Sequence, residues 1–140
     1  MLKKYIYHIG NIDTIIEFFI KIMKIRRNVI ISGDTGTGKT TIIKKIIFLL
    51  NKKINITSPS FSMCNIYKTR KYTIKHFDLY KVNSIKELFL LEINKYKENN
   101  IIIIETNNLI GVKELNNYKC IRVYLSLYYS KYARKIYFVY

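Results

Sequence analysis

The sequence predicts an α/β domain with three layers, α/β/α, in which helices cover a mostly parallel sheet that carries some antiparallel additions. Strand-like and helix-like stretches alternate around one glycine-rich loop. Four consecutive isoleucines at 101–104 show no polar alternation, as expected of a parallel strand buried on both faces. A hairpin and two terminal strands would supply the antiparallel additions. We expect residues 1–140 to form a single domain, because 140 residues are enough for one core.

The first fifty residues contain two strand patterns and two helix patterns. Residues 3–9 are strand-like, and Asn11 is a suitable N-cap for a helix over residues 12–24, where apolar residues recur at i, i+3 and i+4. Residues 29–32 form a short β-branched run. Residues 39–50 are apolar at helical spacing. Together these patterns predict the order strand, helix, strand, loop and helix.

The middle of the chain predicts a hairpin and a further helix. Residues 54–57 are a short strand candidate, which must end by Ser58 because Pro59 cannot donate to a ladder. Residues 63–67 and 71–77 are strand-like on either side of a short turn, and we expect them to pair antiparallel. A capping box from Ser84 to Glu87 predicts a helix over residues 85–94.

The last forty residues predict three strands. The isoleucine run ends in Glu105, and a polar connection follows from residue 107 to residue 117. Residues 121–128 and 135–140 are strand-like, and we expect residues 129–134 to join them.

The glycine-rich loop carries the clearest chemical signal in the chain. The spacing Gly33-x-x-x-x-Gly38-Lys39-Thr40 matches the phosphate-binding loop pattern of P-loop NTPases in full, and it lies between a predicted strand and a predicted helix. Glycines let the backbone wrap closely around phosphate and direct N–H groups inward, and the helix N-terminus adds its dipole. Lys39 would reach the β- and γ-phosphates, and the Thr40 hydroxyl would ligate Mg²⁺. The expected nucleotide-binding residues of this segment are Asp34, Thr35, Gly36, Thr37, Gly38, Lys39, Thr40 and Thr41.

Two carboxylates are candidates for the metal and for placing water. Glu105 ends the buried isoleucine strand, where nucleotide hydrolases hold an acidic metal ligand, although an acidic residue also commonly marks where a strand meets solvent. Asp78 follows a predicted strand and is the second candidate, its alternative role being to start a turn. His76 is isolated, which favours a structural role over that of a general base.

The chain has a formal charge of +16, which suggests a nucleic acid or another anionic surface as partner. The abundance of Lys, Ile, Asn and Tyr offers an alternative, because AT-rich codons encode these residues. Cys64 and Cys120 fit no metal or disulfide spacing and are expected to be buried thiols in a reducing cytoplasm. The N-terminus is a poor signal peptide, and no apolar run is long enough to span a membrane.

Five segments in order resemble the TsaE (YjeE) family, the small ATPases that support bacterial synthesis of N6-threonylcarbamoyladenosine in tRNA. They are the loop from Gly33 to Thr41, Ser58-Pro-Ser-Phe61, His76-Phe-Asp-Leu-Tyr-Lys81, Glu87-Leu88 and the isoleucine strand with Glu105. The second and third segments together make the resemblance specific, since the loop alone occurs in many families. It extends from Asn11 to Glu105 and is weak beyond.

The resemblance implies Mg²⁺-dependent ATP hydrolysis, slow without partners, in a cytoplasmic protein that acts with TsaB and TsaD type proteins and meets tRNA indirectly or weakly. In that reading Lys39, Asp78 and Glu105 are catalytic, and Thr40 and Glu105 hold Mg²⁺. Residues 58–62 would act as a switch-like loop over the nucleotide. The resemblance also implies nucleotide contacts for Thr14 in the first helix and Arg134 near the C-terminus.

Two residues depart from the family pattern. Thr106 stands where the family commonly has Trp, and Lys81 stands where it has Arg, which removes a bidentate fork. A small-molecule P-loop kinase is the main alternative, but it needs a lid with clustered arginines, and the five arginines here are dispersed. A GTPase would need an Asn-Lys-x-Asp signature, which is absent. A plain RNA-binding protein is the third alternative.

Overall fold

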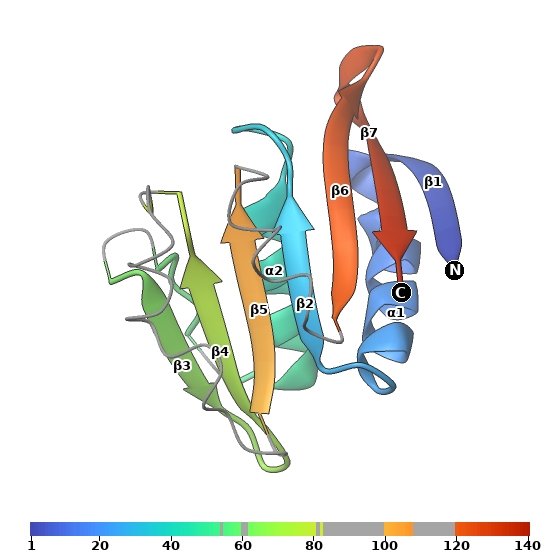
Figure 1. Cartoon of the computed structure of the whole chain (residues 1–140). Helices are drawn as coiled ribbons and strands as arrows, with labels where there is room; N and C mark the ends of the chain where they lie inside the picture. The colour runs from blue at the N-terminus through green and yellow to red at the C-terminus, as the bar shows by residue number, and fades with distance from the viewer. Residues whose placement is uncertain (54, 60–61, 81, 83–99, 108–119) are drawn as a thin grey trace.

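The computed structural model describes residues 1–53, 55–59, 62–80, 82, 100–107 and 120–140. These residues form a seven-stranded sheet in the order β1-β7-β6-β2-β5-β4-β3 (Figure 1). The strands are β1 (Leu2–His8), β2 (Asn28–Ser32), β3 (Cys64–Lys68), β4 (Thr73–Asp78), β5 (Asn100–Thr106), β6 (Ile121–Tyr128) and β7 (Ser130–Val139). The helices are η1 (Ile9–Asn11), a single 3₁₀ turn, α1 (Ile12–Met23) and α2 (Lys39–Leu50).

The sheet is mixed, so the expectation of a mostly parallel sheet was wrong. The strand β2 pairs in parallel with β5 and β6, and β4 pairs in parallel with β5. Antiparallel pairs join β1 to β7, β6 to β7 and β3 to β4. The parallel pairs therefore occupy the centre, and hairpins and the N-terminal strand extend both sides.

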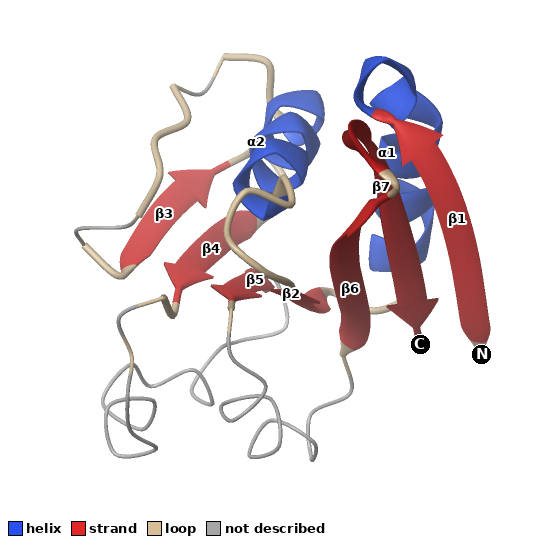
Figure 2. Cartoon of the chain, turned by 90° about the horizontal axis from the view of Figure 1, so that it is seen from above, coloured by secondary structure: helices blue, strands red, loops and turns tan. Residues whose placement is uncertain are grey.

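The two α-helices, α1 and α2, lie on the same face of the sheet (Figure 2). Their apolar sides and the strands beneath them enclose the main core, which contains Phe19, Ile43, Ile103 and Phe138. The three-layer arrangement is not confirmed, because the helix expected over residues 85–94 lies outside the described residues. The opposite face of the central strands carries a second buried cluster: Ile30, Phe77, Leu79, Ile102, Ile104 and Cys120.

Several element predictions are confirmed. The second helix runs from Lys39 to Leu50 as its apolar spacing predicted, and the first begins at Ile12. The hairpin of β3 and β4 is antiparallel. The isoleucine strand is parallel to both of its neighbours and is almost completely buried. Periodicity was informative in these segments because each has one clear burial pattern.

Other predictions were wrong in detail. Asn11 makes no side-chain cap hydrogen bond to α1, because η1 already leads the chain into the helix. Residues 55–57 are not in a strand. The last strand starts at Ser130, so the connection expected over residues 129–134 is largely strand. Its pairing partner β1 begins at the other end of the chain, and that long-range pairing extends the strand beyond its local pattern.

Candidate functional site

The carboxyl ends of β2, β4 and β5 meet at one edge of the sheet, because these strands run parallel. The register places Glu105 of β5 beside Asp78 of β4 and beside Ile31 of β2. The loop of residues 33–38 leaves β2 at this edge and leads into α2. Such edges are where open α/β sheets bind ligands.

The loop backbone depends on glycine at its first position. Gly33 has φ +150°, and a Cβ atom there would lie 2.3 Å from the carbonyl oxygen of Leu125 in β6. Gly36 and Gly38 also have positive φ, at +81° and +98°, which residues with a side chain rarely adopt. Thr37 closes the turn by donating its hydroxyl to the carbonyl of Asp34 at 2.8 Å. The conformation of the loop is therefore restricted by its own backbone angles and by its close approach to β6.

Lys39 lies at the start of α2 with its ammonium group against this loop. Its Nζ donates to the carbonyl oxygens of Gly33 at 2.8 Å and Asp34 at 3.0 Å. Burial lowers the pKa of Lys39 below its usual value, and the nearby carboxylates of Glu105 and Asp78 offset part of that effect. An ammonium group held against a glycine-rich loop at a helix N-terminus is suited to bind the oxygens of a phosphate chain.

Thr40 and Glu105 are joined directly across the site. The Thr40 hydroxyl donates to Oε1 of Glu105 at 2.5 Å. Glu105 is buried, with 6% of its surface exposed. The pair brings a hydroxyl and a carboxylate from α2 and β5 to one point at the mouth of the loop. Both groups offer the oxygen ligands that Mg²⁺ prefers, and a nucleotide site supplies the remaining oxygens from phosphate and water.

His76 of β4 completes the surroundings of Glu105. Its Nε2 lies 3.4 Å from Oε2 of Glu105, its side chain is 0% exposed, and its Nδ1 has no hydrogen-bond partner among the described residues. Burial alone would raise the pKa of Glu105. The hydrogen bonds from His76 and Thr40, with the charges of His76 and Lys39, instead hold that pKa below its usual value. Glu105 is therefore a carboxylate at neutral pH.

Asp78 faces the same edge from β4. Its Oδ1 accepts a hydrogen bond from the backbone N–H of Tyr80 at 3.0 Å, which is the turn-starting geometry considered from the sequence. The N–H of Leu79 donates to the carbonyl of Glu105 at 2.8 Å, so the chain after β4 stays attached to β5. Asp78 thus starts a turn and also lines the site.

A pocket of about 390 Å³ opens at this edge. The structure brings together at this pocket Asp78, Glu105, Lys39 and five further residues of the loop and first helical turn that the sequence had suggested: Thr35, Gly36, Gly38, Thr40 and Thr41. Tyr80 and Asn107 also line it and were missed as site residues. Asn107 donates from Nδ2 to the hydroxyl of Thr35 at 3.0 Å and so joins the end of β5 to the loop. Only its position directly after the buried strand could have indicated it.

Four residues expected at the nucleotide do not line the pocket: Thr14, Asp34, Thr37 and Arg134. Asp34 and Thr37 belong to the loop and shape its turn. Thr14 is exposed on α1. Arg134 is buried and donates from Nε to the carbonyl of Thr37 at 2.9 Å and from an Nη to that of Gly36 at 3.4 Å. The guanidinium therefore supports the loop through its backbone.

The expected switch-like loop is only partly described. Residues 60 and 61 and Lys81 lie outside the described residues. At the end of this loop the N–H of Met63 donates to the carbonyl of Pro59 at 2.7 Å, and the carbonyl of Met63 accepts from Asp78. The loop is thus anchored at one end to the strand end that carries Asp78. Thr106, at the position of the family Trp, is buried and pairs with Ser32 in the register of β2 and β5.

The geometry can be compared with known proteins. The family model "Threonylcarbamoyl adenosine biosynthesis protein TsaE" matches residues 8–136. The chain belongs to the TsaE family. It is a family of tRNA threonylcarbamoyladenosine biosynthesis, which confirms the resemblance of the separate segments and extends it nearly to the C-terminus.

Curated relatives agree with this assignment. The TsaE protein of Rickettsia prowazekii is 36% identical over 95 residues, which are 67% of this chain and 66% of that protein. The TsaE protein of Haemophilus influenzae is 32% identical over 78 residues, 55% of this chain and 49% of that protein. The matched part of the chain therefore spans about half to two thirds of the length of these relatives.

The fold also matches a solved structure. The crystal structure of Bacillus subtilis YdiB superposes with a TM-score of 0.62 at 19% identity, covering 99% of this chain and 86% of that one. Within the part of the chain that the structure describes, no helix combines the length and apolarity needed to cross a membrane. Nor do the described residues bring three or more His, Cys, Asp or Glu side chains together as a metal cluster.

Proposed function

We propose that this chain binds ATP with Mg²⁺ and hydrolyses it slowly as an accessory protein for N6-threonylcarbamoyladenosine formation in tRNA. The observation that carries the proposal is the Thr40–Glu105 hydrogen bond, formed at the mouth of the glycine loop and next to Lys39. A phosphate cradle, a cation and a pair of oxygen ligands then meet in one pocket. These are the parts that phosphoryl transfer from a nucleotide requires.

Each residue would have a distinct task. The N–H groups of the loop and Nζ of Lys39 would bind the phosphates, with Lys39 exchanging its present carbonyl partners for phosphate oxygens. Thr40 and Glu105 would hold Mg²⁺, which neutralises charge on the phosphates when bound. Asp78 would orient the attacking water directly or through the metal's water shell. His76 would keep Glu105 ionised and in place.

The proposed partners are proteins of the TsaB and TsaD type, with the chemistry on tRNA carried out by TsaD. In this proposal the segment from Ser58 to Ser62 acts as a switch-like loop that transmits the nucleotide state to these partners. In support, the described end of this segment is hydrogen-bonded to the backbone of Asp78. Hydrolysis would then reset the shape of an assembly, without a second small substrate.

Nucleotide titration of Lys39→Ala tests the ATP site. We expect affinity for ATP·Mg²⁺ to fall roughly 10- to 150-fold, since a hydrogen-bonded charge contributes about 1.5–3 kcal/mol. Lys44→Ala is the matched control, because Lys44 is exposed on the same helix and does not line the pocket. Equal affinity of the wild type and Lys39→Ala would end the proposal of an ATP site.

The biological role needs a separate test. The purified chain would be added to its TsaB and TsaD counterparts, and tRNA modification would be followed over many turnovers. We expect turnover to stop early without this chain and with Lys39→Ala in its place. Modification that proceeds equally well without it would leave ATP binding intact and refute the accessory role.

A small-molecule kinase is the alternative, and no specific contact favours it. None of the five arginines, all in described positions, lines the pocket, whereas a kinase lid uses arginines to clamp the transferred phosphate. A phosphate-release assay distinguishes the two activities. Phosphate release into water without an acceptor supports the ATPase, and stable transfer to a small molecule would support the kinase.

A further inference from the structure

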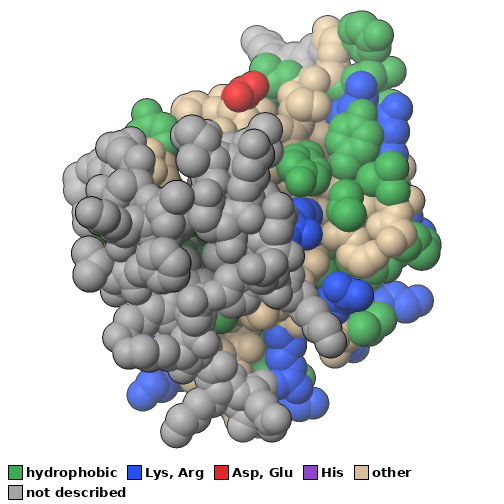
Figure 3. All heavy atoms as spheres, viewed as in Figure 1, with side chains coloured by type: hydrophobic (Ala, Val, Ile, Leu, Met, Phe, Trp, Pro, Cys, Tyr) green, Lys and Arg blue, Asp and Glu red, His purple; other side chains and the backbone are tan. Residues whose placement is uncertain are grey.

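One face of the β1-β7-β6 half of the sheet points away from both helices. Side chains alternate along these strands, so Val123, Leu125, Ile136 and Phe138 enter the main core while their neighbours point to the other side. Those neighbours include Tyr124, Tyr128, Lys135, Tyr137 and, on β1, Lys4, all partly or fully exposed. We call these five residues the tyrosine–lysine face. Figure 3 shows hydrophobic and Lys or Arg side chains gathered over β6, β7 and β1 on this side.

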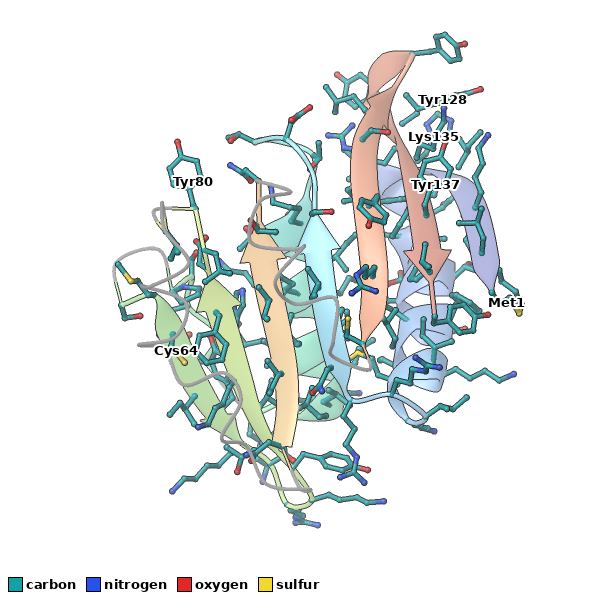
Figure 4. All side chains as sticks on the ribbon, in the orientation of Figure 1. Met1, Cys64, Tyr80, Tyr128, Lys135 and Tyr137 are labelled. Carbon is teal, nitrogen blue, oxygen red and sulfur yellow. The ribbon has the colours of Figure 1, made fainter. Side chains whose placement is uncertain are left out.

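The strand register arranges these side chains in rows across the sheet. Lys4, Tyr137 and Tyr124 are direct neighbours on three adjacent strands. Lys135 lies one row further along, opposite Ser126. The Lys4 Nζ lies 5.9 Å from the centroid of the Tyr137 ring, and the Lys135 Nζ lies 4.9 Å from that of Tyr128. Figure 4 shows Tyr128, Lys135 and Tyr137 close together on this face. Each lysine is therefore paired with a ring.

The charge of this face is of one sign. Strands β1, β6 and β7 contain no Asp or Glu, and the whole chain carries +16. Neither Lys4 nor Lys135 takes part in the two ion pairs found among the described residues. A surface of rings and ammonium groups that form no ion pair with the other described residues is complementary to a partner that has flat apolar groups and regularly spaced negative charges. Single-stranded nucleic acid has both.

We propose that the tyrosine–lysine face binds single-stranded RNA. Bases stack on Tyr124, Tyr128 and Tyr137, and backbone phosphates are bound by Lys4 and Lys135. Tyr124 and Tyr128 are four residues apart on one strand, which separates their Cα atoms by about 13 Å. That span suits a short run of nucleotides laid along β6.

A protein partner is the competing occupant, and the composition argues against it. Protein–protein interfaces are depleted in Lys and enriched in aromatic residues and Arg, whereas here two of the three rings on the face lie beside a lysine. Exposed aliphatic residues occur at the rim: Leu2, Ile6 and Val139. These three lie on the edge strand and the adjacent strand end, and Leu127, directly before Tyr128 in β6, is exposed as well.

This proposal goes beyond the proposed ATP site and does not depend on it. No residue of the tyrosine–lysine face lines the pocket. Loss of RNA binding with intact ATP binding, or the reverse, therefore separates the two.

The test uses the full chain and a fluorescently labelled single-stranded RNA octamer of mixed sequence, followed by fluorescence anisotropy over a range of salt. We expect Tyr137→Leu to weaken binding roughly tenfold and Tyr137→Phe to bind like the wild type, because phenylalanine keeps the stacking surface. Lys4→Gln with Lys135→Gln should reduce the slope of log K against log salt by about 0.7 for each phosphate that is no longer bound.

The matched control removes two lysines from the opposite side of the molecule. Lys21→Gln with Lys44→Gln removes the same charge from exposed positions on α1 and α2 and should leave the RNA affinity nearly unchanged. Thermal denaturation checks that each variant is folded. Equal weakening of RNA binding in the two double variants would mean that net charge alone attracts RNA, and would overturn the proposal. Unchanged RNA binding in the face variants, with a loss of self-association by light scattering, would assign the face to a second copy and also overturn it.

Discussion

The two halves of the sheet differ in how many of their faces are buried. In β2 and β5, successive residues are buried on both faces, as Ile103 and Ile104 show. In β6 from Ile121 to Ser126, and in β7 from Arg134 to Phe138, buried and partly exposed residues alternate, so Phe138 is in the core while Tyr137 beside it is partly exposed. The half buried on both faces holds the pocket, and the half buried on one face presents an exposed surface. The number of buried faces thus separates the part of the sheet that carries the pocket from the part that carries the tyrosine–lysine face.

Alanine scanning of adjacent pairs should reproduce this difference and gives the largest expected effects. Ile103→Ala and Ile104→Ala should each lower the free energy of unfolding by about 2–5 kcal/mol, because both side chains are buried. In β7, Phe138→Ala should cost about 3–5 kcal/mol, whereas Tyr137→Ala should cost about 1 kcal/mol or less. Urea denaturation measures all four. Similar costs for Phe138 and Tyr137 would mean that the second half is buried on both faces too.

The next largest loss of stability should follow from disturbing the contact at Gly33, where the two halves of the sheet meet. Gly33→Ala places a Cβ against the carbonyl of Leu125 and forces alanine into positive φ, which we expect to cost about 3 kcal/mol. Gly10→Ala is the control, since a Cβ there would meet nothing within 4 Å. Thermal denaturation compares the two variants. If both unfold at the same temperature, the loop is not held against β6 as closely as the geometry indicates.

The smallest of the expected effects is a loss of folding stability on acidification, and it should originate in the half of the sheet that holds the pocket. The folded-state pKa of Glu105 lies below its usual 4.5, so its contribution to stability is present above about pH 4.5. It is lost as the pH falls through the lower folded value. Glu105→Gln should therefore flatten the decline of stability over this acidic range, measured by urea denaturation at several pH values. Lys4→Gln, in the other half, should leave the slope unchanged, and an identical slope for Glu105→Gln would contradict the assignment.

The sequence predicted those parts of the site that depend on local backbone rules. The glycine spacing, the helix from Lys39 to Leu50 and the buried strand ending in Glu105 all follow from patterns within a few residues. Residues that reach the site from distant segments were harder to assign. His76 was taken as structural, and its contact with Glu105 across 29 positions was not foreseen. Asn107 was placed in a polar connection and was missed.

What the sequence by itself determined is the phosphate loop and its flanking strand and helix, because φ/ψ freedom and burial period are properties of neighbouring residues. The tertiary structure decided how the strands pair. Only that pairing makes the sheet mixed, brings Arg134 to the loop carbonyls of Gly36 and Thr37 across 98 and 97 positions, and places the side chains of the tyrosine–lysine face on one side of the sheet. The hairpin of β3 and β4 could be predicted from its short turn, whereas the pairing of strands far apart in the chain depends on the packing of the whole molecule.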